Sequence, residues 1–114
     1  MKPINLDECV ELARKKEPFE FNNVFALARL NHPEYPPSYT VFSYGLHYPM
    51  YVYDYEACQW IGNKDKSTPT TEKHKRKFKP YSVAHWVDTK TLKEIAARGL
   101  VVTTARRMEE AYAT

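Results

Sequence analysis

Residues 39–61 read YTVFSYGLHYPMYVYDYEACQWI, and this stretch decides the fold. Aromatic and β-branched residues dominate it, and turn-forming segments interrupt it twice. The pattern predicts three strands, over residues 39–44, 50–55 and 59–61. Connections this short force neighbouring strands to pair antiparallel, because a parallel crossover needs about a dozen residues or more. The centre of the chain is therefore expected to form an antiparallel meander.

Helical patterns lie on both sides of the meander. Asn5 followed by Glu8 resembles a capping box, and the spacing of the apolar residues after them predicts a helix over 5–16. Asp88 is the expected N-cap of a second helix that ends near Gly99, where a left-handed cap fits. A short third helix is expected after it.

Residues 23–30 fit either a strand or a short helix, and their β-branched and aromatic start favours a strand. The expected fold class is α+β: an antiparallel meander of three or four strands, with one N-terminal helix and two C-terminal helices packed on one face. With 114 residues, of which 43% are apolar and 14% aromatic, the chain has the size of a single domain, 1–114. This composition argues against intrinsic disorder.

The two cysteines, Cys9 and Cys58, lie far apart in sequence and are expected to be reduced and buried. No cysteine and histidine spacing is typical of a zinc site, so neither a metal nor another cofactor is expected. No apolar stretch has the length of a signal peptide or a membrane span. We therefore expect a cytoplasmic protein without a membrane partner.

A strongly basic run ends the polar segment 64–80, which is expected to be a loop. Seven lysine and arginine residues face two carboxylates between positions 64 and 79, a local charge of +5 in a chain of net charge +3. Such a cluster favours binding of phosphates or of an acidic partner. Phe78 and Tyr81, next to it in sequence, are the expected stacking residues for bases. The alternative is a solvated loop without a partner. The candidate partner-binding residues here are Lys64, Lys66, Lys73, His74, Lys75, Arg76, Lys77 and Lys79.

Tyrosines crowd the second predicted strand. Tyr51, Tyr53 and Tyr55 share one face by the two-residue period of a strand. Because an antiparallel sheet can leave one face in water, this row is the candidate solvated face and a second part of the partner surface. The alternative is that single tyrosines cover the edge of the core.

Catalytic patterns are weak. His47 and His74 fit the acid–base pair of a small nuclease, with Lys66 or Lys73 holding a phosphate. Structural or surface histidines explain them more simply, and no catalytic residue is assigned.

The C-terminal region has the layout of a helix-turn-helix. Residues 92–99 would form the first helix, 100–103 the turn, and a following helix carries Arg106 and Arg107. A helical hairpin packed on the sheet explains the same residues.

Tyr39-Thr-Val-Phe-Ser-Tyr44 is followed by Trp60 and then by Asp65-Lys-Ser-Thr-Pro-Thr-Thr-Glu-Lys-His74. This arrangement resembles a family of small uncharacterised bacteriophage proteins with the pattern Tyr-x-Val-Tyr-Ser-Tyr, a Trp, and Tyr-Ser-x-Thr-Thr-Ser-Arg-His-Gln. Ser67, Glu72 and Lys75 depart from that pattern. Thr68 stands at the Ser of the pattern, and Lys73 stands conservatively at its Arg. The other matching positions are Tyr39, Val41, Ser43, Tyr44, Trp60, Thr70, Thr71 and His74.

The resemblance implies a phage or mobile-element origin and brings no assigned chemistry with it. Together with the basic run, it predicts a non-enzymatic binding protein that modulates or inhibits a host nucleoprotein or defence complex in the host cytoplasm, for example in an anti-CRISPR-like role. The alternative is a protein that binds DNA or RNA directly, and the weaker alternative is the nuclease. The sequence leaves the oligomeric state open.

Overall fold

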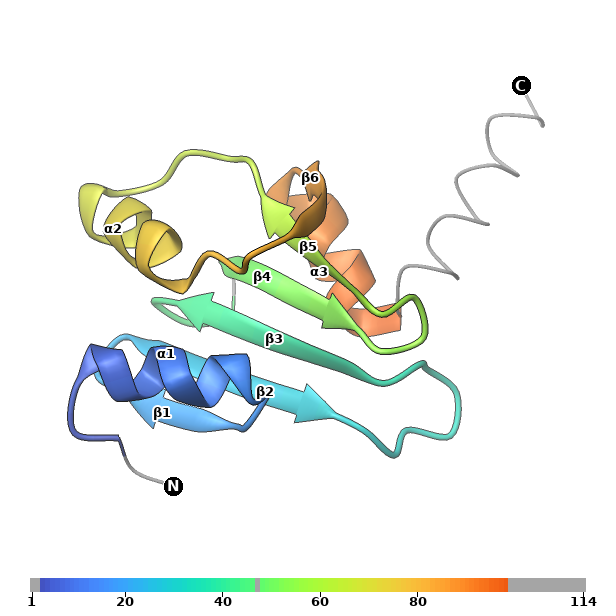
Figure 1. The fold of residues 1–114 in the computed structure, drawn as a ribbon. Coiled ribbons are helices and arrows are strands. Elements are labelled where there is room, and N and C mark those ends of the chain that lie inside the picture. Colours follow the sequence, from blue (N-terminus) through green and yellow to red (C-terminus); the bar gives the residue numbers. More distant parts are fainter. Residues whose placement is uncertain (1–2, 47, 99–114) are drawn as a thin grey trace.

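The structure of the chain is a computed structural model that describes residues 3–46 and 48–98 (Figure 1). The strands form one mixed sheet in the order β1-β2-β3-β4-β5-β6. All neighbours pair antiparallel except β5 and β6, which pair parallel. The elements are α1 Leu6–Arg14, β1 Phe19–Phe21, β2 Val24–Arg29, β3 Ser38–Ser43, β4 Pro49–Asp54, β5 Gln59–Asn63, α2 Pro69–Phe78, β6 Val83–Val87 and α3 Thr89–Arg98.

The α+β class is confirmed, and so are the meander at its centre and the strand expected over 23–30. The sheet has six strands rather than three or four. The prediction missed β1, which has only three residues, and β6, whose partner β5 lies a whole crossover away in sequence.

Local capping explains why α1 begins where it does. The Asn5 side chain accepts a hydrogen bond from the Glu8 backbone at 2.9 Å, and the Glu8 carboxylate accepts one from the Ile4 backbone at 2.7 Å. This arrangement satisfies donors that the first turn leaves unpaired. After the helix, Lys16 adopts a φ of 57°, which turns the chain toward β1.

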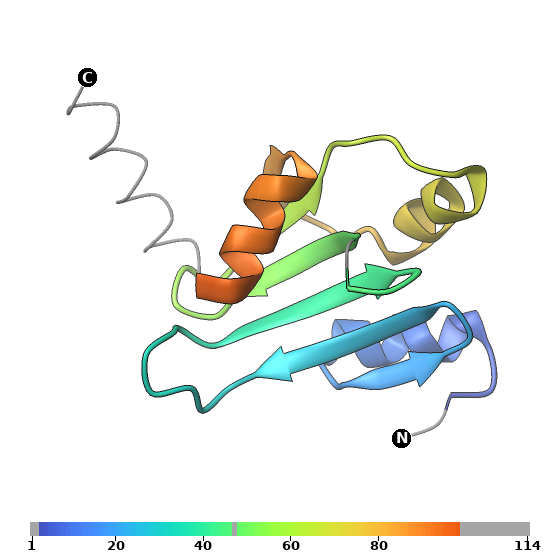
Figure 2. The same cartoon turned by 180° about the vertical axis from the view of Figure 1, so that it is seen from behind.

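Helices cover both faces of the sheet. α1 and α2 lie on the face seen from the front in Figure 1, and α3 lies on the opposite face, which Figure 2 shows. Tyr51 of β4 joins the core under α1 and α2, whereas its neighbour Val52 packs against Leu92 and Ile95 of α3. The expectation that the helices share one face is therefore wrong. All six residues of β3 are buried, which requires cover on both sides.

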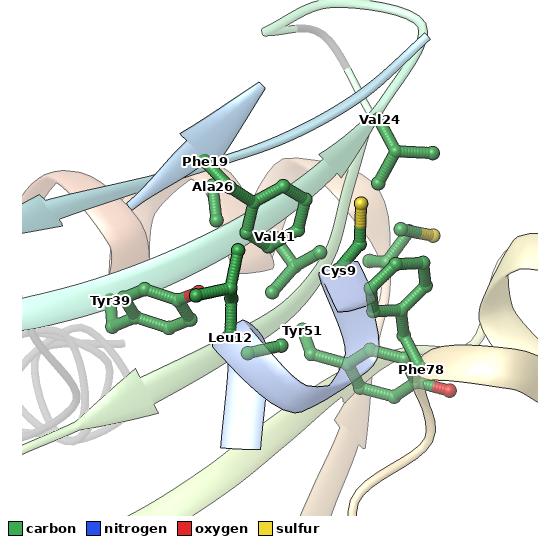
Figure 3. Close-up of a cluster of buried hydrophobic side chains, with 11 residues drawn as sticks. Cys9, Leu12, Phe19, Val24, Ala26, Tyr39, Val41, Tyr51 and Phe78 are labelled. Carbon is green, nitrogen blue, oxygen red and sulfur yellow. The ribbon is translucent and has the colours of Figure 1, made fainter. Parts of the chain in front are cut away.

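The larger core lies between the sheet and the first two helices. Cys9 and Leu12 come from α1, Phe78 comes from α2, and they meet Tyr39 and Val41 of the sheet (Figure 3). Burial raises the pKa of the Cys9 thiol to about 11 and keeps it protonated, as expected for a buried cysteine. Cys58 corrects the second half of that expectation, because it is exposed in the turn after β4.

The segment expected to be a loop contains α2. Thr68 is its N-cap and accepts a hydrogen bond from the Thr71 backbone at 3.2 Å. Pro69 occupies the first turn, where its missing N–H costs nothing. Basic residues fill the last turn, where they interact favourably with the negative end of the helix dipole. The Ser/Thr/Pro composition that suggested a loop is a helix start, and α2 is the crossover that makes β5 and β6 parallel.

α3 follows its prediction within the described residues. The Asp88 carboxylate accepts a hydrogen bond from the Thr91 backbone at 2.7 Å, and Leu92 and Ile95 are buried. The expected Gly99 cap, the third helix and the helix-turn-helix with Arg106 and Arg107 lie outside the described residues. In residues 3–46 and 48–98 no helix has the length and apolar character needed to cross a bilayer.

Candidate functional site

The outer surface of α2 carries a cluster of cations. Lys73, Arg76 and Lys77 lie three and four positions apart, so they share one helix face, and all three are exposed. Lys64 and Lys66 precede the helix and Lys79 ends it, and they are exposed as well. The basic segment is thus a helix with its flanks, and we call Lys64, Lys66, Lys73, Arg76, Lys77 and Lys79 the cationic face.

Two of the predicted partner-binding residues in this segment, Lys75 and His74, contact other parts of the protein instead of facing solvent. The Lys75 ammonium donates to the Asp65 carbonyl at 3.0 Å and lies 3.5 Å from the Glu72 carboxylate. His74 is buried beneath the helix. Within the cationic face, Lys77 forms an exposed ion pair with Asp7 of α1 at 2.8 Å. Such surface pairs are weak, so Lys77 can exchange this partner for another anion.

Residues of the family-like pattern meet where β3 ends against α2. The Ser43 hydroxyl lies 3.1 Å from the Thr71 hydroxyl and 3.0 Å from Nδ1 of His74. Tyr44 stacks on the His74 ring with centroids 6.2 Å apart, and its φ of 59° turns the chain at the strand end. Thr70 lines a cavity of about 150 Å³ beside Tyr44 and His74. His74 thus bonds to the end of β3 through Ser43.

This junction holds α2 in place, and its two hydroxyls are closed to an external substrate. Ser43 is fully buried and Thr71 is 2% exposed, so neither hydroxyl can reach an external group. Burial, with the neighbouring Lys73 charge, lowers the pKa of His74 below its usual 6.5 and keeps the imidazole neutral. His47, the predicted nuclease partner, lies outside the described residues. Among the residues that are described, no three His, Cys, Asp or Glu side chains converge as metal ligands would.

Replacing His74 with asparagine should remove an acid-sensitive part of the stability. Because the pKa of His74 is lowered in the folded state, the unfolded chain takes up the proton first as pH falls below about 6.5. Wild type should therefore lose stability relative to His74→Asn as pH falls below about 6.5, and the difference should be constant above about pH 7. Urea unfolding of both proteins across this range measures it. The subtraction cancels the other histidines and the carboxylates, and a pH-independent difference would contradict the assignment.

The prediction that the tyrosine row forms a solvated face is wrong. Tyr51 is 1% exposed and its hydroxyl donates to the Lys75 carbonyl at 2.7 Å, and burial raises its pKa. Tyr53 and Tyr55 are half-buried and pack edge to face with centroids 5.0 Å apart. The row lies on the face of the sheet that α1 and α2 cover, where it packs into the larger core. Tyr51 thus holds α2, which carries the cationic face, against the sheet.

Tyr39 and Trp60, the remaining positions of the pattern, form a second cluster. The Tyr39 hydroxyl donates to the Glu17 carbonyl at 2.7 Å, and its ring meets Trp60 edge on at 6.2 Å. The Lys16 ammonium lies 4.3 Å from the Tyr53 ring centroid and 6.0 Å from that of Trp60. Lys16 was not among the predicted site residues, because no local pattern connects it to a strand so far away in sequence.

Asp65 is a second residue that the sequence analysis missed. Its carboxylate accepts hydrogen bonds from the Thr89 backbone at 2.8 Å and from the Thr89 hydroxyl at 2.7 Å, and these bonds lower its pKa. Its carbonyl accepts from Lys75, so Asp65 connects the start of α3 to α2.

Comparisons of the chain with protein-family models, with curated proteins and with solved structures return no match. The resemblance to the bacteriophage family stays a prediction.

Proposed function

We propose that the chain is a non-enzymatic binding protein whose cationic face contacts the phosphates of a nucleic acid, either free or within a host nucleoprotein complex. The observation that carries the proposal is the arrangement of Lys73 and Arg76, exposed on one side of α2, with Lys66 and Lys79 at its two ends. Cations at this spacing neutralise successive phosphates and release counterions.

The two carboxylates of the segment offset only part of this charge. Glu72 lies 3.5 Å from the Lys75 ammonium, and Asp65 keeps its negative charge while it accepts hydrogen bonds from Thr89. Seven cations against these two carboxylates leave the segment with a charge of +5. The cations therefore dominate the potential outside α2, although the chain as a whole carries only +3.

The resemblance to phage proteins adds the biological setting of the proposal. A phage protein of this kind would act in the host cytoplasm on a nucleoprotein or defence complex and reduce its activity. The buried hydroxyls at the Ser43–His74 junction favour binding over catalysis. A protein partner with an acidic surface is the second candidate, since the same exposed cations suit carboxylates.

A titration against labelled single-stranded and double-stranded DNA at about 50 and 200 mM salt tests the proposal. Removing two phosphate contacts with Lys73→Gln and Arg76→Gln should weaken duplex binding on the order of tenfold per contact at the lower salt. It should also reduce the magnitude of the slope of log K against log salt by about 0.9 for each contact.

The matched control replaces two exposed lysines outside the cationic face, Lys90→Gln and Lys93→Gln, which removes the same charge. Its binding should stay close to wild type. Absence of DNA binding at the lower salt, or equal weakening by both double variants, would overturn the proposal and direct the search to a protein partner.

A further inference from the structure

A groove of about 250 Å³ lies beside the cationic face, between α1 and the segment that leaves α2. Val41 and Trp60 come from the sheet, and Arg14 comes from α1. Lys79 and Tyr81 come from the segment that follows α2. Lys79 thus belongs to both the cationic face and the groove.

Aromatic rings give the groove its chemistry. Trp60 is held by Tyr53, with ring centroids 5.2 Å apart, so its orientation is fixed by the core. Tyr81 is 98% exposed, the largest exposure among the described large apolar residues. Phe78, which the sequence suggested as a stacking residue, is instead buried against Phe19 and forms a wall. A fixed ring and an exposed ring at one groove suit a planar ligand.

Two cations lie near these rings. The Arg14 guanidinium lies 5.8 Å from the Tyr81 ring centroid, and Lys16 lies 6.0 Å from that of Trp60. Lys79 also lines the groove, and its ammonium lies 5.9 Å from the ring of Trp86, outside the groove. Glu11 forms an exposed pair with Arg14 at 2.8 Å, which contributes little. The groove therefore favours a ligand that is both planar and anionic.

We propose that this groove binds one unpaired base of a nucleic acid whose phosphates lie along the cationic face. Its volume is below the ~300 Å³ at which sites for drug-sized ligands begin, so it accommodates a single ring system rather than a longer segment. Bases in a duplex are stacked on both sides and cannot enter, so the site prefers single strands. This inference rests on the proposed function and adds the base to the phosphates.

Two probes of equal length separate the base from the backbone: an oligothymidylate and an abasic deoxyribose–phosphate oligomer. Wild type should bind the oligothymidylate on the order of tenfold more tightly, since stacking on an aromatic side chain is lost with the base. Tyr81→Ala should remove this preference and leave binding of the abasic oligomer and its salt dependence unchanged. Because Tyr81 is exposed, the substitution leaves the core intact. Tyr35→Ala, at an exposed tyrosine outside the groove, is the control and should keep the preference.

The outcomes separate the two proposals. Equal, salt-sensitive binding of both probes would overturn the base site and leave the phosphate-binding function standing. A preference that survives Tyr81→Ala would overturn the groove as its origin. Failure of both probes to bind would overturn the function and the base site together. Binding of a polyglutamate of equal length as tightly as the oligothymidylate would also overturn the base site, because a peptide acid offers no ring.

Discussion

Replacing Leu92 with alanine should lower the free energy of unfolding by about 3 kcal/mol. Leu92 is fully buried between α3 and the sheet, where the cluster consists of Val52, Ile61, Leu92 and Ile95. So small a cluster cannot collapse to fill the cavity that alanine leaves. The loss in the free energy of unfolding comes from the removed side-chain contacts and from this unfilled cavity. Urea denaturation measures the change, and the melting temperature should fall by roughly 10–20 °C.

The matched control is Lys93→Ala, on the exposed side of the same helix. It should change the free energy of unfolding by less than about 0.5 kcal/mol, because it touches no buried feature. A loss of under about 1 kcal/mol for Leu92→Ala would mean that the layer formed by α3 contributes little to the fold.

Replacing Asn63 with alanine should destabilise the fold by about 2–4 kcal/mol, although Asn63 is polar. Its buried amide donates to the Pro49 carbonyl at 2.9 Å and to the Thr89 hydroxyl at 3.1 Å, and its oxygen accepts from the Asp65 backbone at 2.9 Å. Alanine leaves these groups without their partner in a site from which water is largely excluded. Chemical denaturation gives the magnitude.

Two substitutions at Thr89 test whether the same network is responsible. Thr89→Ser keeps the hydroxyl and should stay near wild type, whereas Thr89→Val removes it and should cost about 1–3 kcal/mol. Combined with Asn63→Ala, Thr89→Val should cost less than the sum of the single effects, because the two side chains share a hydrogen bond. Additive losses would contradict a shared network.

The parts of the fold that were predictable are those with local signals. Asn5 and Asp88 mark helix starts through bonds to residues three positions away, and the meander follows from alternating residues joined by short turns. β6 and the two-sided cover of the sheet depend on pairings between distant segments, for which the sequence has no local marker. α2 had such a marker in Thr68-Pro69, a cap followed by a first-turn proline, and the interpretation as a loop overlooked it.

The candidate site divides in the same way. Composition alone located the basic segment, but the roles of Lys75 and His74 inside the protein depend on Asp65 and Ser43, which reach them only after folding. The tyrosine row was expected to face solvent, but it packs into the core. A two-residue period shows which residues share a face of the sheet, and not whether that face is covered. The exposed Tyr81 and the cations near Trp60 come together only through tertiary structure.

The crossover position of α2 has a consequence for folding. Because β6 pairs with β5 only after the intervening chain has crossed the sheet, we expect this pairing to form late, after the hairpins. The cationic face is held on that crossover by Ser43 and Tyr51, so an incompletely folded chain does not present it in its final arrangement. Under the proposed function, nucleic acid binds only the arranged face, so the melting temperature should rise as the concentration of nucleic acid increases.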